Sequence, residues 1–389
     1  MSIPKEEARD RKYDAFRIDL AEAAEDLVLL TAGPLQWLKT SGLQHHVLAA
    51  WQTALRFGYF AAVPLNGPPI PAPDLAARVG MDADRLSRFM KLLASQRCFR
   101  EVGDGAFEHT ALSAYVARNK DVEAMLAFQA DEMFEAASLT ATSIEKAPYT
   151  SDAPHSAFNL RFGMSPYQWY AANPERGARF ASAMAGWGEM NQVTAKLRDG
   201  FPWGNIRNKT VVDVGGGSGH IAMYLAAQFQ DLHFIVQDIN PGMLSQGPKR
   251  PEFAAVEGRV SFMQHDFLQP QPVADPSGTG LFFIRQITHN YPDDVCVEIL
   301  RALVPALERC APDTGLLIND AVMPAPHQIS RVEEYHLRQV DMAMLNGYAA
   351  KQRTLQEFAR LLEVADERLK IFKVHQEGIV GLLEVRLVK

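Results

Sequence analysis

The C-terminal half of the chain alternates between short apolar runs and longer segments with helical periodicity. The apolar runs are TVVDVG, FIVQDI, VSFMQH, GLFFIRQI and GLLINDAV. Continuous runs of this length, rich in Val, Ile, Leu and Phe, are typical of strands buried on both faces of a parallel sheet. Two further runs, KIFKVH and GIVGLLEVRLV, are only a few residues apart and predict an antiparallel hairpin. The pattern predicts an α/β, Rossmann-like domain with a mostly parallel seven-stranded sheet and a C-terminal antiparallel hairpin.

The N-terminal third has a different pattern, in which apolar residues recur at helical spacing. We expect one helix over the first forty residues, broken at Gly33-Pro34, and a second over 44–60. Helices at 74–80 and 82–96 then precede a two-stranded element at 98–110. Helix, helix and hairpin in this order form a winged-helix arrangement. The long apolar helices before it have more hydrophobic surface than a small winged helix can bury, which predicts a dimerisation domain and a homodimer.

Between these two parts, residues from about 121 to 198 are helical in pattern and rich in aromatic residues and Met. Any single one of these side chains is best interpreted as helical core. Together they also suit the lining of a pocket for a flat, apolar ligand. We therefore expect a helical, winged-helix-like dimerisation domain at 1–120, a helical linker lining the substrate pocket at 121–200, and a cofactor-binding catalytic domain at 201–389.

Composition and charge limit the partners of the protein. A length of 389 residues exceeds what one hydrophobic core usually serves, and the net charge of −7 argues against binding to nucleic acid. The three cysteines are odd in number and widely spaced, so they predict neither a disulfide framework nor a metal site. The charged N-terminus lacks an apolar signal region, and no run of 18 apolar residues occurs. We expect a cytoplasmic protein that acts on a small molecule without a membrane partner.

The segment DVGGGSGH combines a strand end, a glycine turn and a helix start. Gly215, Gly216 and Gly217 let the backbone approach a ligand closely, and the first N–H groups of the helix point into the turn. About 20 residues further on, the next apolar run ends in Asp238, the offset at which a carboxylate can accept both ribose hydroxyls. A solvated Asp at a strand end is the alternative. Asp266 follows the third run and would lie near the adenine, so the pattern indicates a nucleotide site.

In these motifs the chain resembles plant- and fungal-type O-methyltransferases that use S-adenosylmethionine. The resemblance covers nearly the whole chain and rests on DVGGGSGH, QDI, FIRQITHNYPDDVCVEIL, LLINDAVMP and DMAMLNGYAAKQRTLQEF. It implies that His289 is the general base, with Asp320 and Gln352 at the positions of the acidic residues that flank it. It also implies cofactor contacts, for which the candidates are Asp213, Gly215, Gly216, Gly217, Asp238, Asp266, Phe267 and Arg285.

The chemistry of methyl transfer requires such a base. A phenol with a pKa of about 10 must lose its proton as its oxygen attacks the methyl group, and a neutral imidazole within hydrogen-bond reach can accept it. His289 lies just beyond a predicted strand, and a carboxylate such as Asp320 can fix the tautomer of the ring. The alternative for His289 is a structural histidine that closes the strand. The chain has Asn290 and Gln352 where the family usually has acids, which removes negative charge from around the base.

These departures favour a second hypothesis. Fungal methyltransferase-like pericyclases of pyridone pathways resemble the same family but catalyse dehydration or cycloaddition without transferring methyl. Their pockets act through shape and hydrogen-bond donors, and the candidates here are Arg285, Gln286 and His289. A DNA-binding regulator is disfavoured by the charge of the chain. We expect no metal site, because no set of Asp and Asn residues on strand ends remains beyond those assigned above.

Overall fold

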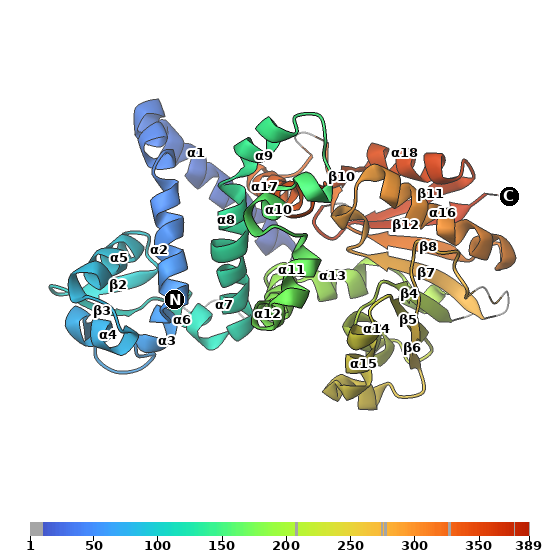
Figure 1. Ribbon diagram of the computed structural model, residues 1–389, viewed down its shortest axis with the longest axis horizontal. Coiled ribbons are helices and arrows are strands. Elements are labelled where there is room, and N and C mark those ends of the chain that lie inside the picture. The colour runs from blue at the N-terminus through green and yellow to red at the C-terminus, as the bar shows by residue number, and fades with distance from the viewer. Residues whose placement is uncertain are drawn as a thin grey trace. The chain divides into compact units, whose positions relative to one another are not determined.

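The computed structural model describes residues 11–206, 209–273, 275, 278–325, 328–376 and 378–388, which form two compact units (Figure 1). Unit 1 comprises the chain up to residue 146 together with residues 157–191 and 330–332. Unit 2 comprises residues 147–156, 192–329 and 333–389.

Unit 1 is mostly helical. Its elements are α1 (Arg11–Ser41), α2 (Gln44–Arg56), α3 (Tyr59–Ala62), β1 (Ile70–Pro71), α4 (Ala72–Val79), α5 (Ala83–Ser95), β2 (Phe99–Val102), β3 (Ala106–His109), α6 (Ala111–Arg118), α7 (Lys120–Phe128), a π-helical turn (Gln129–Met133), α8 (Phe134–Ala137), α9 (Thr140–Lys146), α10 (Ala157–Phe162), α11 (Pro166–Ala172) and α12 (Pro174–Met190).

The first long helix, α1, bends where the sequence predicts a break. Gly33 has a φ of 68° and a ψ of 172°, and Pro34 follows it inside the helix. Glycine tolerates this conformation because it has no Cβ. Large apolar side chains of α1 remain exposed, among them Leu20 at 71%, Leu30 at 81% and Leu35 at 83%. Helix α1 therefore does not bury its apolar surface within its own chain.

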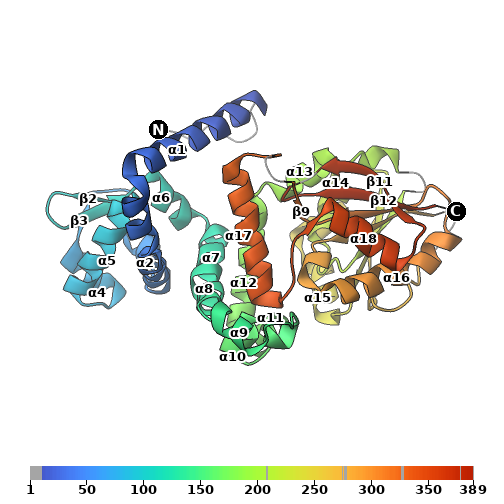
Figure 2. The same cartoon turned by 90° about the horizontal axis from the view of Figure 1, so that it is seen from above.

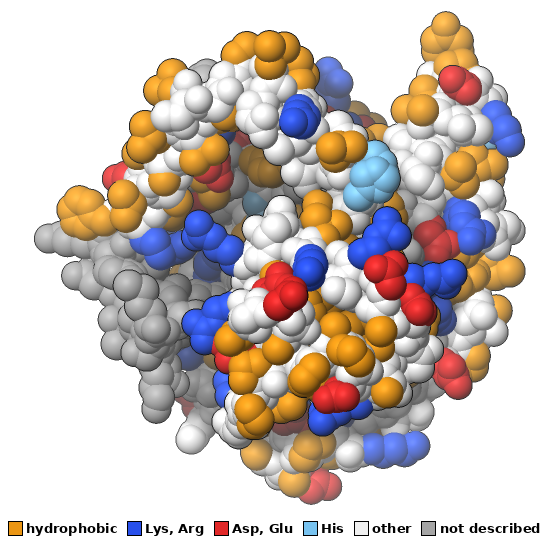
Figure 3. Space-filling model, turned by 90° about the vertical axis from the view of Figure 1, so that its left-hand side faces the viewer, with side chains coloured by type: hydrophobic (Ala, Val, Ile, Leu, Met, Phe, Trp, Pro, Cys, Tyr) orange, Lys and Arg blue, Asp and Glu red, His pale blue; other side chains and the backbone are white. Residues whose placement is uncertain are grey.

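The predicted winged helix is present. The strands form a small sheet in the order β1-β3-β2, in which β1 adds a short third strand to the predicted hairpin. The Asp82 side chain accepts a hydrogen bond from the backbone N–H of Arg85 and so caps α5. The core between these elements contains Tyr59, Phe60, Phe99 and other buried residues. On the surface in Figure 3, Lys and Arg side chains lie among acidic and hydrophobic ones, which does not fit a DNA-binding face.

The π-helical turn in unit 1 carries two adjacent buried acids. Asp131 is 4% exposed and Glu132 is 3% exposed. Asp131 accepts hydrogen bonds from Arg56 Nε at 2.6 Å, Arg176 Nη1 at 2.9 Å and Arg179 Nη1 at 2.7 Å. Arg179 also binds Glu132 through Nη2. This ion cluster joins α2, the π-helical turn and α12, because buried carboxylates require such partners.

Unit 2 contains the predicted seven-stranded sheet. Its strands are β4 (Thr210–Val214), β5 (His233–Asp238), β6 (Val260–Gln264), β7 (Thr279–Arg285), β8 (Gly315–Asn319), β11 (Leu369–Gln376) and β12 (Leu382–Leu387). The order is β11-β12-β8-β7-β4-β5-β6; β12 is antiparallel to both of its neighbours, β11 and β8, and the other neighbouring pairs are parallel. The predicted Rossmann-like domain with a C-terminal hairpin is therefore confirmed.

Helices cover both faces of the sheet in unit 2. They are α13 (Val193–Gly200), α14 (His220–Gln228), α15 (Pro241–Gln246), α16 (Asp293–Arg309) and α18 (Leu355–Ala365). The helix α17 (Arg331–Tyr348) lies in the chain between β9 (Val322–Met323) and β10 (Arg353–Thr354), two short strands that pair in parallel. Val212 and Val214 point into the core beneath α16 and α18, whereas Val211 points into the core beneath α13 and α14. This alternation is the period of two expected of a strand. In Figure 2, α13 and α14 lie on one side of the sheet and α16 and α18 on the other. No helix within the described ranges is long and apolar enough to cross a membrane.

Candidate active site

The glycine turn lies between β4 and α14. Gly215, Gly217 and Gly219 have φ values of 74°, 60° and 75°, which side chains with a Cβ rarely adopt. Gly216 has an ordinary φ, but a Cβ at this position would collide with the Asp213 carboxylate and come within 2.9 Å of Val236 Cγ1. The backbone of the turn is therefore accessible at close range, as a nucleotide cofactor requires.

Asp238 lies at the end of β5, directly beside the turn. Its Oδ2 accepts a hydrogen bond from the backbone N–H of Gly217 at 3.0 Å, and its Oδ1 accepts one from the N–H of Asn240 at 2.9 Å. These two bonds fix the plane of the carboxylate. Each oxygen still has a lone pair, so the geometry fits a ligand with two adjacent hydroxyls.

Asp213 is buried behind the turn, and the half-buried Arg285 is its charged neighbour. Neither Asp213 Oδ2 nor Arg285 Nε has a hydrogen-bond partner among the described residues. Burial raises the pKa of Asp213 to about 7, while Arg285 acts in the opposite direction. Burial likewise lowers the pKa of Arg285, against the attraction of Asp213 and Asp320. Polar atoms left without a partner beside a glycine turn fit a site for a charged cofactor group.

Asp266 and Phe267 follow β6. The Asp266 Oδ1 accepts a hydrogen bond from the N–H of Leu268 at 3.0 Å, so this carboxylate shapes its own turn. The ring of Phe267 meets that of Tyr291 edge to face, with centroids 5.8 Å apart. Burial raises the pKa of Tyr291, with Asp238 and Asp266 as charged neighbours. The structure thus brings both predicted acids near one aromatic pair that can contact a flat base.

The candidate base lies in a 3₁₀ turn, Thr288–Asn290, that follows β7. The side chain of His289 is 17% exposed, and its Nδ1 lies 3.4 Å from Asp320 Oδ1 and 3.3 Å from Gln352 Nε2. Asp320 is held from its other oxygen, because Oδ2 accepts hydrogen bonds from the Thr288 N–H at 3.0 Å and the Thr288 hydroxyl at 2.5 Å. The predicted catalytic residues His289, Asp320 and Gln352 therefore meet at one imidazole nitrogen.

Burial lowers the pKa of His289 below its ordinary value. Asp320 raises this pKa, whereas the positive charges of Arg285 and Arg353 lower it further. A lowered pKa keeps the imidazole neutral at pH 7, which is the form that accepts a proton.

The amide of Gln352 determines which tautomer of His289 it supports. Gln352 Oε1 is buried without a partner among the described residues, and a half turn of the amide would bring it to His289 Nδ1. In that orientation Nδ1–H donates to both Asp320 and Gln352, and Nε2 becomes the proton acceptor. With the amide nitrogen facing Nδ1, only the opposite tautomer is supported.

Two other predicted residues have structural contacts. Gln286 has a φ of 51°, its N–H donates to Asn319 O at 2.8 Å, and its carbonyl accepts a hydrogen bond from Asn290 Nδ2 at 3.0 Å. The Asn290 side chain therefore bonds to the backbone of its own turn, whereas that of Gln352 faces His289 Nδ1. The loss of an acid at position 290 therefore affects the charge around His289 less directly than the loss of an acid at position 352.

Sequence reasoning missed several residues that organise this site. Thr288 anchors Asp320, Tyr291 faces the cofactor acids, and Arg353 binds the turn that carries the base. Arg353 and Thr354 stand in the quoted motif KQRT, but the motif alone gives Arg353 no role. No local pattern could have found it, because the partners of Arg353 lie about 60 residues earlier in the chain.

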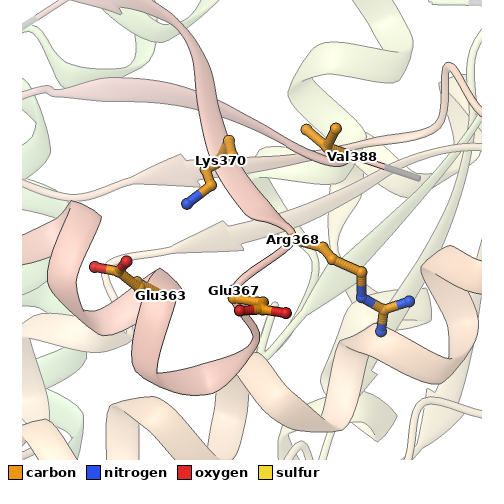
Figure 4. Close-up of a pocket in the computed structure, with 5 residues that line it drawn as sticks. All are labelled: Glu363, Glu367, Arg368, Lys370 and Val388. Atoms are coloured by element: carbon orange, nitrogen blue, oxygen red, sulfur yellow. The ribbon is translucent and has the colours of Figure 1, made fainter.

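A separate surface cavity has a volume of about 330 Å³ and lies at the β11 edge of the sheet (Figure 4). It is lined by Glu363, Glu367, Arg368, Lys370 and Val388. β12 and β8 separate this edge from β7 and β4, which carry Arg285 and the glycine turn. The cavity does not belong to the candidate active site.

Comparisons with known proteins match both parts of the chain to described families. The O-methyltransferase domain family matches residues 145–366, and the O-methyltransferase dimerisation domain matches residues 43–119. The O-methyltransferase sol2 of Alternaria solani is 46% identical over 376 residues, which cover 97% of this chain and 86% of that protein.

Two solved structures share the fold. The crystal structure of OxaC aligns with a TM-score of 0.81 at 23% identity, over 97% of this chain and 94% of that one. A structure described as a pericyclic reaction enzyme aligns with a TM-score of 0.76 at 21% identity, over 98% of this chain and 95% of that one.

Proposed function

This chain belongs to the S-adenosylmethionine-dependent O-methyltransferase family of fungal secondary metabolism, and we propose that it methylates a hydroxyl of an aromatic or polyketide-derived small molecule with His289 as general base. S-adenosyl-L-methionine is the cofactor of this family. The cofactor acids Asp238 and Asp266, the glycine turn and the base segment all lie in unit 2.

The observation that carries the proposal is the environment of His289 Nδ1. A carboxylate 3.4 Å from this nitrogen, anchored from behind by Thr288, favours a proton on Nδ1, and the flipped amide of Gln352 would favour the same tautomer, which leaves Nε2 as the acceptor. The same carboxylate stabilises the imidazolium that forms when the acceptor hydroxyl loses its proton. A histidine that merely closed a strand would not need a buried acid oriented toward it.

The roles of the residues follow from their contacts. The bound cofactor supplies an electrophilic methyl group. The glycine turn and Asp238 would hold its nucleoside part, and the Phe267–Tyr291 pair would offer an aromatic surface to its base. His289 Nε2 accepts the proton of the acceptor hydroxyl, which turns the oxygen into a stronger nucleophile at the moment of attack. Positioning the oxygen in line with the methyl group contributes much of the acceleration.

The aromatic residues of unit 1 support a flat, apolar acceptor. Phe158, Phe162 and Trp169 pack together, with ring centroids 4.5 to 5.9 Å apart. Tyr170 stacks on Phe180 at 4.4 Å with an interplanar angle of 13°. Stacked aromatic surfaces favour planar ligands. The placement of this segment as a pocket lining stays a prediction.

We further propose that the protein is a homodimer in which α1 extends the interface of the dimerisation domain. The matched dimerisation domain begins at residue 43, directly after α1. The exposed apolar side chains of α1 need a partner surface, because monomeric proteins rarely expose so much contiguous apolar area. They include Phe16, Leu20, Leu27, Val28, Leu30, Leu35, Trp37 and Leu38.

A pericyclase that binds the cofactor without transferring methyl is the second candidate. Two observations favour it: the residue that shares Nδ1 with Asp320 is the neutral Gln352, and the half-buried Arg285 has an Nε without a partner among the described residues. Arg285 would then polarise a carbonyl of the substrate, with Gln286 and His289 shaping the site.

The two functions are separated by following the methyl group. The purified protein is incubated with methyl-labelled S-adenosylmethionine and a panel of phenols and pyridones, and mass spectrometry measures label in the products and release of S-adenosylhomocysteine. We expect labelled product, reduced by at least about two orders of magnitude in His289→Ala. A substrate that loses water or isomerises while the cofactor stays intact would instead support the pericyclase. Unchanged methylation by His289→Ala would exclude His289 as the general base.

A further inference from the structure

Arg353 is a buried arginine at the first position of β10. It is 1% exposed, whereas arginine normally keeps its charged head in water. β10 pairs in parallel with β9, with Arg353 opposite Val322. Such burial requires that the guanidinium group find partners inside the protein.

Those partners are the backbone and one acid of the segment that carries the base. Arg353 Nη1 donates to the carbonyl of Thr288 at 2.7 Å, and Nη2 donates to the carbonyl of Tyr291 at 2.9 Å. Nε and Nη2 both reach Asp293 Oδ1, at 2.9 and 2.7 Å. The two carbonyls lie one residue before and two residues after His289. A planar guanidinium that bonds both sides of a turn restricts the turn in orientation as well as position.

We propose that Arg353 is the positioning residue of the general base: its guanidinium holds the turn 288–291 so that His289 Nδ1 stays between Asp320 and Gln352. The hydrogen bonds of Arg353 go to Thr288, Tyr291 and Asp293 and not to the glycine turn or Asp238, so it acts on the site through the turn that carries His289. This inference rests on the proposed function of His289.

The charge of Arg353 gives a second way to detect its action. Burial lowers the pKa of His289, Asp320 raises it, and Arg285 and Arg353 lower it. These three charged groups face the ring from the ends of β8 and β7 and from the start of β10. Asp293 only partly neutralises Arg353, because its side chain is 51% exposed and its Oδ2 also binds Lys351 at 3.2 Å.

Two substitutions separate position from charge. Arg353→Lys keeps the positive charge but cannot bond both carbonyls and Asp293 at once. We expect kcat to fall about tenfold to a hundredfold, because a base displaced by about 1 Å loses that much rate, while the His289 pKa stays close to that of the wild type. Arg353→Met removes the charge as well. We expect a similar loss of kcat together with a His289 pKa above that of the wild type. The dissociation constant for S-adenosylmethionine should change far less than kcat in both variants, because Arg353 reaches the cofactor site only through the backbone carbonyl of Tyr291.

The pKa and the tautomer are measured by ¹⁵N NMR of histidine-labelled protein without acceptor, with the His289 signal assigned from His289→Gln. Thermal unfolding establishes that each variant is folded. If Arg353→Met does not fold, the test rests on Arg353→Lys. The matched control is Arg368→Met. It removes another arginine of the same unit, which is itself 41% exposed and binds Asp366 and Glu308, away from His289. This variant should match the wild type in every readout.

A wild-type kcat, pH profile and His289 tautomer in both Arg353 variants would overturn the inference. So would a loss of cofactor affinity equal to the loss of kcat, because that result would mark a general structural defect. The NMR readouts do not need turnover. If the wild-type protein transfers no methyl, the proposed function fails, while the effect of Arg353 on the ring of His289 is still tested.

Discussion

Replacing Gln352 with Glu restores a carboxylate beside the base and tests the geometry at His289 Nδ1 directly. The side chain of Gln352 is 4% exposed, and its amide nitrogen lies 3.3 Å from Nδ1. Glu has nearly the same shape as Gln, so the substitution changes the charge at this position with little change in packing.

The magnitude follows from the distance. A negative charge 3.3 Å from an imidazolium contributes about 1.3 kcal/mol at the dielectric constant of water, about 80, and about 5 kcal/mol at an effective constant of about 20. The desolvation of a new buried carboxylate offsets several kcal/mol of the larger figure. We therefore expect a net effect near the lower figure, which raises the His289 pKa by about one unit.

The assay is the pH dependence of kcat for transfer of a labelled methyl group. In the wild type, activity is lost as the pH falls through the lowered pKa of His289, because the protonated ring cannot accept a proton. In Gln352→Glu this loss should begin about one pH unit higher, with a higher kcat on the plateau because the imidazolium is better stabilised. Gln356→Glu is the control, because it adds the same charge at an exposed position of α18, four residues after Gln352 in the chain. A profile that coincides with the wild type, or that moves to lower pH, would refute the contact or the role of His289.

Three further predictions concern the cofactor, the ion cluster and the dimer. Burial raises the pKa of Asp213 to about 7, with Arg285 and Asp238 as its charged neighbours, and a cationic cofactor favours the ionised carboxylate. The affinity for S-adenosylmethionine, measured by calorimetry, should therefore rise about tenfold from pH 6 to pH 8. The same rise in Asp213→Asn would contradict this. Arg179→Met leaves buried Glu132 without its main partner and should lower the free energy of unfolding in urea by about 3–5 kcal/mol, against at most about 1 kcal/mol for the exposed Arg100→Met. Substituting Leu27 and Leu30 on α1 with Glu should convert a dimer to a monomer in light scattering, and an unchanged mass would exclude α1 from the interface.

Local patterns were sufficient to predict the sheet. Each buried strand corresponds to a continuous apolar run in the sequence. In Thr210–Val214, for example, Val211 packs into one core and Val212 and Val214 pack into the other. The glycine turn and Asp238 could also be predicted from the sequence, because their expected function depends on neighbours within about 20 residues and on the fixed geometry of a parallel strand pair. The domain limits at 120 and 200 stay predictions.

The contacts that hold His289 in place could not be predicted from the sequence in the same way. Arg353 and Thr288 are more than 60 residues apart, and no periodicity links them. The two neutral substitutions, Asn290 and Gln352, look equivalent in the sequence, yet Asn290 bonds to the backbone of its own turn and Gln352 faces Nδ1. Side-chain orientation within a turn depends on tertiary contacts that single-sequence reasoning does not contain.

The most direct test of the central claim compares acceptors of different acidity in the wild type and in His289→Ala. A phenol with a pKa of about 10 needs a base at pH 8, whereas a nitro-substituted analogue with a pKa of about 7 is already ionised. If His289 acts as general base, the rate of methyl transfer from labelled S-adenosylmethionine to the ordinary phenol should fall by at least about two orders of magnitude in His289→Ala, while transfer to the ionised analogue should be largely retained. Equal losses for both acceptors, or no loss for either, would contradict the account.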